Sequence, residues 1–566
     1  MSKDIYNVTD LAAPMDVNFD IKMLMLPMRD GVKLHTSVFF PPGLTGPAPV
    51  VITRSPYTRT TWFALPYAPA LERKCIYIGQ ACRGTGWSEG GVFHPSDYDT
   101  EKNDFADLLE WLKQQEWFDG RCAMLGASYP GWVQWAAARN ADPALVAISP
   151  RVAPIYGCCG FPRTGGGNSW SFMNWALSMY HRRTYGYADV PDYRKLGVHW
   201  HLPANEGDRF AGYGDPLPVF QDLLKPGTVP PGPFLRRHES WFPQLITPAF
   251  IQGGWFDGFK PETVASFRLL KHRGASAEAR NFTRLTIGPW VHGGLDNPEL
   301  FGAENDLSEM QKWEEKFLFG LLNDPHSDPL PGEPAVRYFM LGENRWHDAS
   351  DWPPPGAAAK TFYLHSDGKA NTDGGSISEA SPGEEPPDRY TSDPNHPVSP
   401  WDVLPTDAML YDRSSLEKRE DMLVYTSAKF TEPLTVAGDL RLNFYASAGT
   451  VDTDFFATLT DVTPDGRSLI LTRGMVRARY RNTLDKAELL TPGEVCRYEL
   501  DLGDVAVKFL PGHAMRLEIC GQEFPEFERN ANTGNPAYSD RELLTSVHTV
   551  FHDATRPAEL ILPVLP

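Results

Sequence analysis

The sequence predicts an α/β fold in which a parallel-sheet domain is interrupted by a helical insertion and followed by a domain of antiparallel strands. Three observations predict it. Short apolar runs alternate with helical patterns in residues 1–148 and again in 242–333. The intervening residues 149–241 are rich in Trp, Tyr, Gly and Pro and show no strand rhythm. In residues 334–566, apolar and polar positions alternate with a period of two.

The first region contains strand, helix and strand signals in succession. Ala48 to Thr53 and Cys75 to Ile78 are short apolar runs bounded by Pro and Gly, which is typical of strands buried on both faces of a parallel sheet. Between Glu101 and Gln115, apolar residues recur at helical spacing. A turn then precedes a strand from Arg121 to Leu125. Ser128 therefore lies just beyond the end of a strand.

The insertion, residues 149–241, is predicted to form short helices that cap the sheet domain. After it the strand and helix signals return. Pro248 to Gln252 and Arg284 to Ile287 are strand-like, and Glu262 to His272 is helical.

The C-terminal region, residues 334–566, contains one polar stretch and many alternating ones. Residues 366–400 are dense in Gly, Ser, Pro, Asp and Glu, which predicts a long surface loop. Further on, four apolar side chains alternate with polar ones at Leu440, Leu442, Phe444 and Ala446. Such period-two runs, divided by turns, indicate antiparallel sheet in a sandwich or jelly roll.

Charge and cysteine content exclude some functions. Lys and Arg total 53 and Asp and Glu total 72, so the net charge of −19 argues against nucleic acid or an acidic membrane surface as partner. The seven cysteines form no Cys-x-x-Cys pair, which favours a reducing cytoplasm, and adjacent Cys158 and Cys159 suggest a packed pair. We expect a soluble cytoplasmic protein, because neither a signal peptide nor a long apolar span is evident.

The stretch LGASYPGW, residues 125–132, raises the question of whether Ser128 is a nucleophile or a turn residue. The usual Gly-x-Ser-x-Gly motif fails by one position, because Pro130 precedes Gly131. Gly126 and Gly131 would remove side chains where strand and helix collide. Pro130 is tolerable in the first turn of a helix, whose amides need no partner. A hydrolytic serine also needs a base, an acid that orients the base, and donors for the oxyanion.

Two later residues fit these roles in the chain order Ser, Asp, His of α/β hydrolases. Asp257, in GGWFDGF, follows the strand-like Pro248 to Gln252. His292, in IGPWVHGG, follows the strand-like Arg284 to Ile287 and is bordered by glycines. The competing His272 lies in a predicted helix among basic residues, which suits a solvated surface.

Together these motifs resemble the cocaine esterase family of serine hydrolases, which includes X-prolyl dipeptidyl peptidases, α-amino acid ester hydrolases and some cephalosporin acylases. Its nucleophile motif is Gly-x-Ser-Tyr-x-Gly, and GASYPG fits it. Six further matches follow in the family's order: MRDGVKL from Met28, RSPY ending at Tyr57, RGTGWSEG from Arg83, GWFDGF around Asp257, GPWVH ending at His292, and RWHDASDWP from Arg345.

The resemblance implies an α/β-hydrolase core at 1–148 and 242–333, a helical cap at 149–241 and a jelly roll at 334–566. It implies that Ser128 attacks the acyl carbon, that His292 is the general base, and that Asp257 orients it. The Tyr57 hydroxyl and the Tyr129 amide would stabilise the oxyanion. It implies no cofactor and no metal. Family members range from monomers to larger assemblies, so a homo-oligomer stays open.

Aromatic residues are candidates for substrate binding. Trp170, Phe172 and Trp175 in the predicted cap could line an acyl pocket or form the cap's own core, and their spacing does not decide. Trp255 and Phe256 adjoin Asp257 and are also candidates.

We predict hydrolysis of small or medium carboxylic esters. The alternative is an amidase or peptidase of the same family, because ester and amide cleavage share the same intermediates. Aminopeptidase-like members need carboxylates for a substrate ammonium, and the cap offers four: Asp189, Asp192, Glu206 and Asp208.

Three other functions are disfavoured. A noncatalytic binding protein would need a degenerate triad. A dinucleotide loop at Arg83 lacks the last glycine of its motif, since Glu89 stands there. His199 and His201 could bind metal on a strand, but no third ligand is evident.

Overall fold

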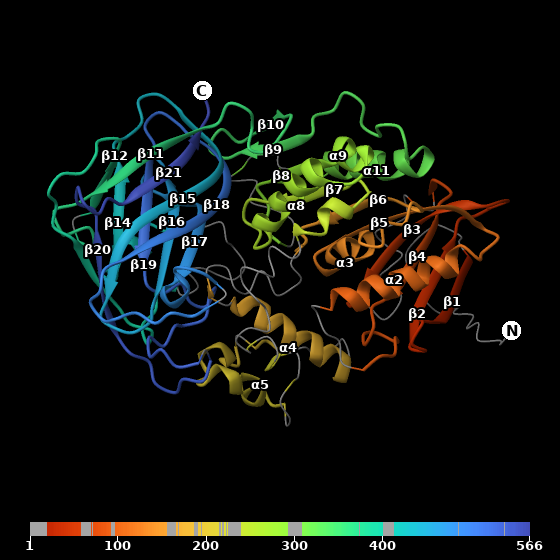
Figure 1. Cartoon of the computed structure of the whole chain (residues 1–566), viewed down its shortest axis with the longest axis horizontal. Coiled ribbons are helices and arrows are strands. Elements are labelled where there is room, and N and C mark those ends of the chain that lie inside the picture. Colours follow the sequence, from red (N-terminus) through yellow and green to blue (C-terminus); the bar gives the residue numbers. More distant parts are fainter. Residues whose placement is uncertain are drawn as a thin grey trace.

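A ten-stranded sheet forms the first domain, with the order β1-β2-β4-β3-β5-β6-β7-β8-β9-β10 (Figure 1). Strands β3 to β9 run parallel to one another, while β1, β2 and β10 pair antiparallel. The strands are β1 Asp20–Pro27, β2 Lys33–Phe40, β3 Ala48–Ser55, β4 Ile76–Ala81, β5 Phe118–Ala127, β6 Leu145–Arg151, β7 Phe250–Gly254, β8 Arg284–Gly288, β9 Val336–Met340 and β10 Arg345–Ala349.

The structure is a computed structural model. It describes residues 20–57, 70, 72–91, 97–155, 166–167, 169–185, 191–193, 195–213, 217, 220–221, 224, 239–292, 301, 308–372, 374–399, 412–484, 486–536 and 538–566. The adjacent Cys158 and Cys159, Asp189 and the N-terminal residues 1–19 lie outside these residues.

Helices cover both faces of this sheet, because successive strand side chains point to opposite faces. Val50 and Ile52 belong to the core shared with α2, α3 and α8, whereas Val51 between them packs in the cluster of α11. The helices are α2 Tyr98–Leu112, α3 Tyr129–Ala138, α8 Lys260–Arg273, α9 Ala277–Phe282 and α11 Ser308–Asn323. The alternating strand and helix signals are thereby confirmed.

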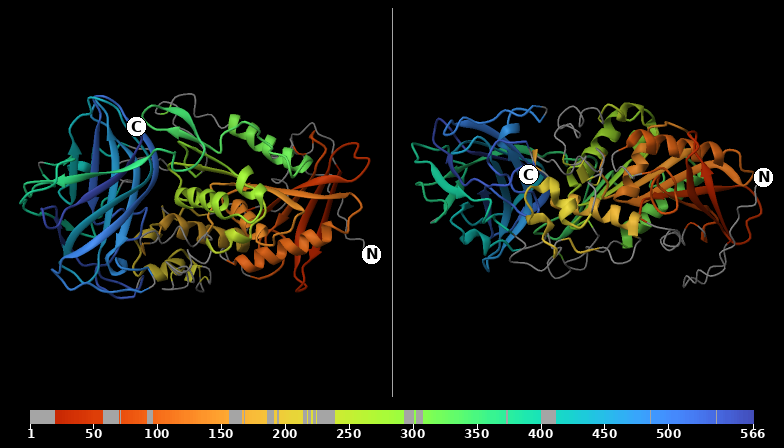
Figure 2. Two further views of the ribbon diagram at one scale, coloured as in Figure 1. Left: turned by 45° about the horizontal axis from the view of Figure 1, so that its top comes forward. Right: turned by 90° about the horizontal axis from the view of Figure 1, so that it is seen from below.

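The described residues between β6 and β7 form a separate helical layer. It contains α4 Trp170–Tyr185, α5 Gly207–Phe210 and three short 3-10 helices, Val198–Trp200, Ala204–Glu206 and Phe242–Gln244. Figure 2 shows this layer, in yellow, between the sheet domain and the C-terminal domain. It contacts the latter directly, since the amide of Trp170 donates to the carbonyl of Glu526 at 3.1 Å.

The C-terminal domain is a β domain of eleven strands, antiparallel except where β12 meets β14. The alternating residues Leu440, Leu442, Phe444 and Ala446 are all buried. Its strands are β11 Ala358–His365, β12 Gly375–Ser378, β13 Asp388–Ser392, β14 Met422–Ser427, β15 Leu434–Ala448, β16 Asp454–Val462, β17 Ser468–Arg477, β18 Cys496–Phe509, β19 Ala514–Cys520, β20 Ser546–Phe551 and β21 Glu559–Val564, with 3-10 helices at Leu416–Lys418 and Ala478–Tyr480.

One detail differs from the expectations. Residues 366–400 are not a free surface loop, because they contribute β12 and β13, where Ile377, Asp388 and Tyr390 are buried. Asp388 is accommodated there by hydrogen bonds from Tyr425 and His552 at 2.7 and 2.9 Å. Strands β9 and β10 pair at the edge of the first sheet.

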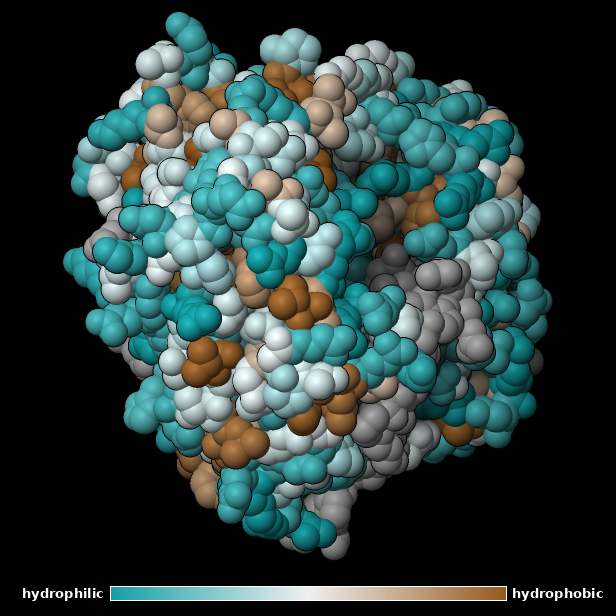
Figure 3. All heavy atoms as spheres, turned by 60° about the vertical axis from the view of Figure 1, so that its left-hand side comes forward, coloured by the Kyte–Doolittle hydropathy of each residue, from teal (hydrophilic) through white to brown (hydrophobic). Residues whose placement is uncertain are grey.

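The visible surface of the C-terminal domain is mainly hydrophilic, with scattered hydrophobic residues (Figure 3). Scattered apolar side chains are normal on a protein surface. Within the described ranges, no helix is both long and apolar enough to cross a membrane.

Candidate active site

Ser128 lies at a sharp turn between β5 and α3. Its backbone adopts φ 62° and ψ −125°, which L-residues rarely adopt, and it immediately precedes the first residue of α3. Such strain costs about 1–3 kcal/mol and is typical of functional positions. The turn brings the half-buried serine to the carboxyl edge of the parallel strands, where α/β folds bind ligands.

Glycines make this turn possible. A Cβ on Gly126, whose φ is +149°, would lie 2.5 Å from Cβ of Pro130. A Cβ on Gly131 would lie 2.6 Å from Cβ of Ala153. Both spacings are far below van der Waals contact, so only glycine fits. Pro130 stands in the first turn of α3, where a missing amide hydrogen costs nothing.

The structure brings His292 and Asp257 to this serine. His292 Nε2 lies 2.9 Å from Ser128 Oγ, and His292 Nδ1 lies 2.6 Å from Asp257 Oδ2. The carboxylate is fully buried, and its other oxygen accepts a 2.7 Å hydrogen bond from the amide of Phe259. The imidazole is 47% exposed, so a substrate can reach it. Meanwhile His272 lies in α8 with its side chain exposed, 3.1 Å from Asp351.

The carboxylate controls the basicity of the imidazole. The surrounding protein tends to lower the pKa of His292, but the charge and hydrogen bond of Asp257 outweigh it and raise that pKa above the ordinary 6.5. A stronger base takes a proton from a hydroxyl more readily. The arrangement can therefore transfer the Ser128 proton to His292 and hold the resulting imidazolium.

Tyr57 and Tyr129 follow neighbouring strands of the sheet. Tyr57 lies two residues beyond β3, is half-buried, and donates its amide to Ser55 Oγ at 3.2 Å. Tyr129 begins α3, and its buried hydroxyl donates to Glu101 Oε1 at 2.9 Å. Because β3 and β5 are parallel partners, both tyrosines are on the same edge of the sheet. The Tyr129 side chain is thus a support beneath the turn, and only its amide could face an oxyanion.

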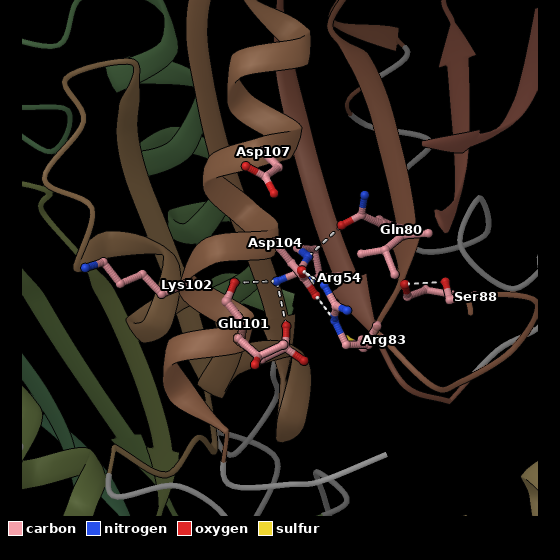
Figure 4. Close-up of polar contacts among 12 residues, drawn as sticks. Arg54, Gln80, Arg83, Ser88, Glu101, Lys102, Asp104 and Asp107 are labelled. Carbon is pink, nitrogen blue, oxygen red and sulfur yellow. Dashed lines mark hydrogen bonds and ion pairs between the residues drawn. The ribbon is translucent and has the colours of Figure 1, made fainter. Parts of the chain in front are cut away.

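A buried ionic network lies under this edge (Figure 4). Arg54 on β3 contacts Glu101 at 2.6 Å and donates to Gln80 at 2.8 Å. Arg83 follows β4 and contacts Asp104 of α2 at 2.6 Å. These contacts explain the RSPY and RGTG motifs, whose arginines tie the strands to α2. The glycines of RGTG have φ of 72° and 55°, as in tight turns, so the motif is a turn after β4.

The three aromatic residues predicted in the cap lie on two different sides of α4. Phe172 and Trp175 stack on each other at 5.2 Å, and Trp175 also stacks on Tyr129 at 6.4 Å, beside the serine. Trp170 instead packs with Met173 and other residues of the cap's own core. The helical layer therefore places Trp175 toward the candidate site and Trp170 away from it.

The aromatic residues around Asp257 also differ in position. Trp255 is 1% exposed and donates through Nε1 to the Phe339 carbonyl at 2.7 Å, so it is a core residue and not a substrate contact. Phe256 is buried and stacks on Phe301 at 5.7 Å. Phe259 is not among the residues predicted from the sequence, and its ring lies edge-on 5.3 Å from that of His292. Its position two residues after Asp257 was the available signal.

The described candidate carboxylates of the cap contact other groups of the protein. Asp192 lies 3.4 Å from Lys195, and Glu206 lies 2.6 Å from Arg541 of the β domain. The buried Asp208 accepts hydrogen bonds from Leu217 and Gln221. All three carboxylates therefore already have partners within the protein.

The described residues include no group of three or more His, Cys, Asp or Glu side chains that could hold a metal ion. His199 belongs to a 3-10 helix, not a strand, and its ring stacks on that of Phe524 at 5.5 Å. The neighbouring His201 stacks on Phe210 at 4.4 Å.

Comparison with known proteins assigns the family. Residues 30–294 match the model of the X-Pro dipeptidyl-peptidase (S15) family, and residues 331–561 match the X-Pro dipeptidyl-peptidase C-terminal non-catalytic domain. The chain is 31% identical to a cocaine esterase of Rhodococcus sp. (strain MB1 Bresler), across 97% of this chain and 100% of that protein. It belongs to the cocaine esterase and X-Pro dipeptidyl-peptidase family. It is therefore a serine hydrolase of esters or peptides.

Solved structures agree on the fold. An α-amino acid ester hydrolase superposes with a TM-score of 0.82 at 24% identity, covering 100% of both chains. An aminopeptidase from a marine sediment Thaumarchaeota archaeon superposes with a TM-score of 0.81 at 24% identity, covering 100% of this chain and 99% of that one. The family architecture, an α/β-hydrolase core with a cap and a C-terminal jelly roll, is therefore that of this chain.

Proposed function

We propose that this hydrolase cleaves carboxylic esters of small or medium size through an acyl-enzyme at Ser128. The observation that carries the proposal is the pair of contacts made by His292, 2.9 Å to Ser128 Oγ and 2.6 Å to Asp257 Oδ2. The full-length similarity to a cocaine esterase supports an ester as substrate.

In the first half of the reaction, Ser128 Oγ attacks the acyl carbon while His292 Nε2 takes its proton. Asp257 stabilises the imidazolium. The negative charge on the former carbonyl oxygen is held by the Tyr57 hydroxyl and the Tyr129 amide. The bond to the leaving alkoxide then breaks, and His292 returns the proton to that oxygen. A water molecule repeats the sequence on the acyl-enzyme and releases the acid.

Hydrolysis of p-nitrophenyl butyrate by the wild type and by Ser128→Ala tests this proposal. We expect the activity to vanish in Ser128→Ala while the variant keeps the wild-type melting temperature. Labelling with a fluorophosphonate should stop as well, because the probe bonds to an activated serine oxygen. Equal rates in the two proteins would exclude Ser128 as the nucleophile.

An amide substrate is the second candidate, because the matched family includes X-Pro dipeptidyl peptidases. The same triad would serve, with the proton passing to an amine. The engagement of Asp192, Glu206 and Asp208 with other groups of the protein favours the ester over a peptide with a free amino terminus. Comparing kcat/KM for Ala-Pro-p-nitroanilide and p-nitrophenyl butyrate separates the two.

A further inference from the structure

The segment that carries Asp257 is fastened to the C-terminal domain at both of its ends. This segment, the Asp257 loop, comprises residues 254–260 between β7 and α8. The matching domain is described as non-catalytic, and none of its residues takes part in the mechanism above.

The first attachment is the side chain of Lys260, the first residue of α8. Its backbone amide donates to the carbonyl of Asp257 at 3.0 Å. Its side chain is 7% exposed and donates through Nζ to Oγ1 of Thr472 on β17 at 2.9 Å. Thr472 in turn donates to the carbonyl of Leu502 on β18. A lysine in the first turn of a helix usually points to water, so its burial against another domain is a costly arrangement.

The second attachment uses two tryptophans. Trp255 packs on Trp352 with ring centroids 5.4 Å apart. Trp352 donates through Nε1 to the buried carboxylate of Asp504 at 2.7 Å. Asp504 is two residues from Leu502 on the same strand, β18. The loop is therefore held at residues 255 and 260 by one strand pair of the β domain, with Asp257 between them.

We infer that Lys260, Thr472 and Trp352 are positioning residues, through which the C-terminal domain holds Asp257 against His292. The inference rests on the proposed roles of Asp257 and His292. A carboxylate displaced from Nδ1 orients the imidazole less well and stabilises its charge less, and a misplacement of about 1 Å can cost about 100-fold in rate. These residues touch neither the serine nor the reacting atoms.

Thr472→Val tests the inference, since it removes the hydroxyl and keeps the shape. Thr460→Val is a matched control: Thr460 is a buried threonine of β16 in the same domain, and its hydroxyl lies 2.7 Å from Ser468 Oγ, a partner outside the loop. We expect kcat for p-nitrophenyl butyrate to fall about 10-fold in Thr472→Val, with KM little changed and the control unaffected. Thr472→Ser, which keeps the hydroxyl, should restore the rate.

The pH profile and a double variant distinguish positioning from general destabilisation. In Thr472→Val the acid limb of kcat/KM should shift to lower pH, because Asp257 is what raises the pKa of His292. In an Asp257→Asn background, Thr472→Val should cause little further loss, because both changes act through the same carboxylate. Equal losses in Thr472→Val and Thr460→Val, an unshifted acid limb, or full additivity with Asp257→Asn would each overturn the inference. An active Ser128→Ala variant would instead overturn the proposed function.

Discussion

Arg54 and Glu101 form a fully enclosed ion pair, 2.6 Å apart, directly under the candidate active site. Glu101 also accepts the hydrogen bond of the Tyr129 hydroxyl. Burial raises the pKa of Glu101 even though Arg54 lowers it. Arg54 lies on β3, the strand before Tyr57, and Glu101 lies on α2. Through the hydrogen bond from Tyr129, the pair also connects β3 to α3, the helix that follows Ser128.

Breaking this pair should destabilise the protein. Replacing Arg54 by Met leaves the Glu101 carboxylate buried without its guanidinium, while Asp104 keeps that of Arg83, at a cost of about 3–5 kcal/mol. Urea denaturation followed by tryptophan fluorescence measures the loss. The double variant Arg54→Met with Glu101→Gln should recover part of the stability, since no buried charge is then left on Glu101. No recovery would mean that the two side chains are not energetically coupled.

Removing the Tyr57 hydroxyl should slow catalysis without weakening substrate binding. An oxyanion donor acts on the charge that develops in the transition state, and losing one costs about 3 kcal/mol. We therefore expect Tyr57→Phe to lower kcat at least 100-fold for p-nitrophenyl butyrate with nearly unchanged KM. A wild-type kcat in Tyr57→Phe would remove this tyrosine from the oxyanion hole.

Asp257 should govern the rate and its pH dependence together. Because the pKa of His292 is raised above 6.5, the imidazole is neutral and can act as a base only at higher pH. We therefore expect kcat/KM to fall as the pH drops through that raised pKa. Asp257→Asn removes the charge, so the acid limb should move down and kcat should fall by up to about 10⁴-fold. Steady-state kinetics from pH 5 to 9 (about the range in which histidine titrates) measure both effects. An unmoved acid limb would contradict the assignment.

Trp175 should influence acyl-chain preference, whereas Trp170 should not. The ring of Trp175 stacks on that of Tyr129, the residue after Ser128, so Trp175→Ala opens space next to the site. We expect the ratio of kcat/KM for p-nitrophenyl octanoate over butyrate to rise. Trp170→Ala is the matched control: it should cost about 3–5 kcal/mol of stability by emptying the cap core, with the ratio unchanged. The reverse pattern would place the acyl pocket on the other side of α4.

Two buried histidines of the β domain should affect stability in opposite pH ranges. Burial lowers the pKa of His548 to about 3, so between about 3 and 6.5 only the unfolded chain binds this proton, and stability falls as the pH falls. Burial also opposes the charged form of His552, but Asp388 and Glu385 outweigh it and raise its pKa. That stabilisation is fully present below pH 6.5 (about the unfolded pKa) and is lost as the pH rises through the folded pKa.

Urea midpoints of the two variants check these signs. Compared with the wild type, His548→Gln should lose less stability on going from pH 6.5 to 4.5, and His552→Gln should lose less from pH 6.5 to 8.5 (windows set by a histidine pKa of about 6.5). Parallel curves for variant and wild type would contradict either assignment.

Much of the site could be predicted from the sequence, because its elements are local. The turn at Ser128 depends on Gly126 and Gly131 within six residues, and Asp257 and His292 each follow a recognisable apolar strand. Spacing of this kind is set by the backbone geometry of one strand or one turn, so no distant contact is needed to predict it. The motif order added the family and the roles proposed for these residues.

Tertiary packing decided the rest. Trp170 and Trp175 are alike in sequence, and only the contacts of α4 direct one into the cap core and the other toward Tyr129. The sequence predicts a loop around Asp388, whereas in the structure Tyr425 and His552, from segments far along the chain, donate hydrogen bonds to its carboxylate. Lys260 is buried through its contact with Thr472, a residue of the β domain that is distant in the chain. The sequence alone determined which groups are candidates for the chemistry, and the tertiary structure determined what holds them, because burial and partners come from segments distant in the chain.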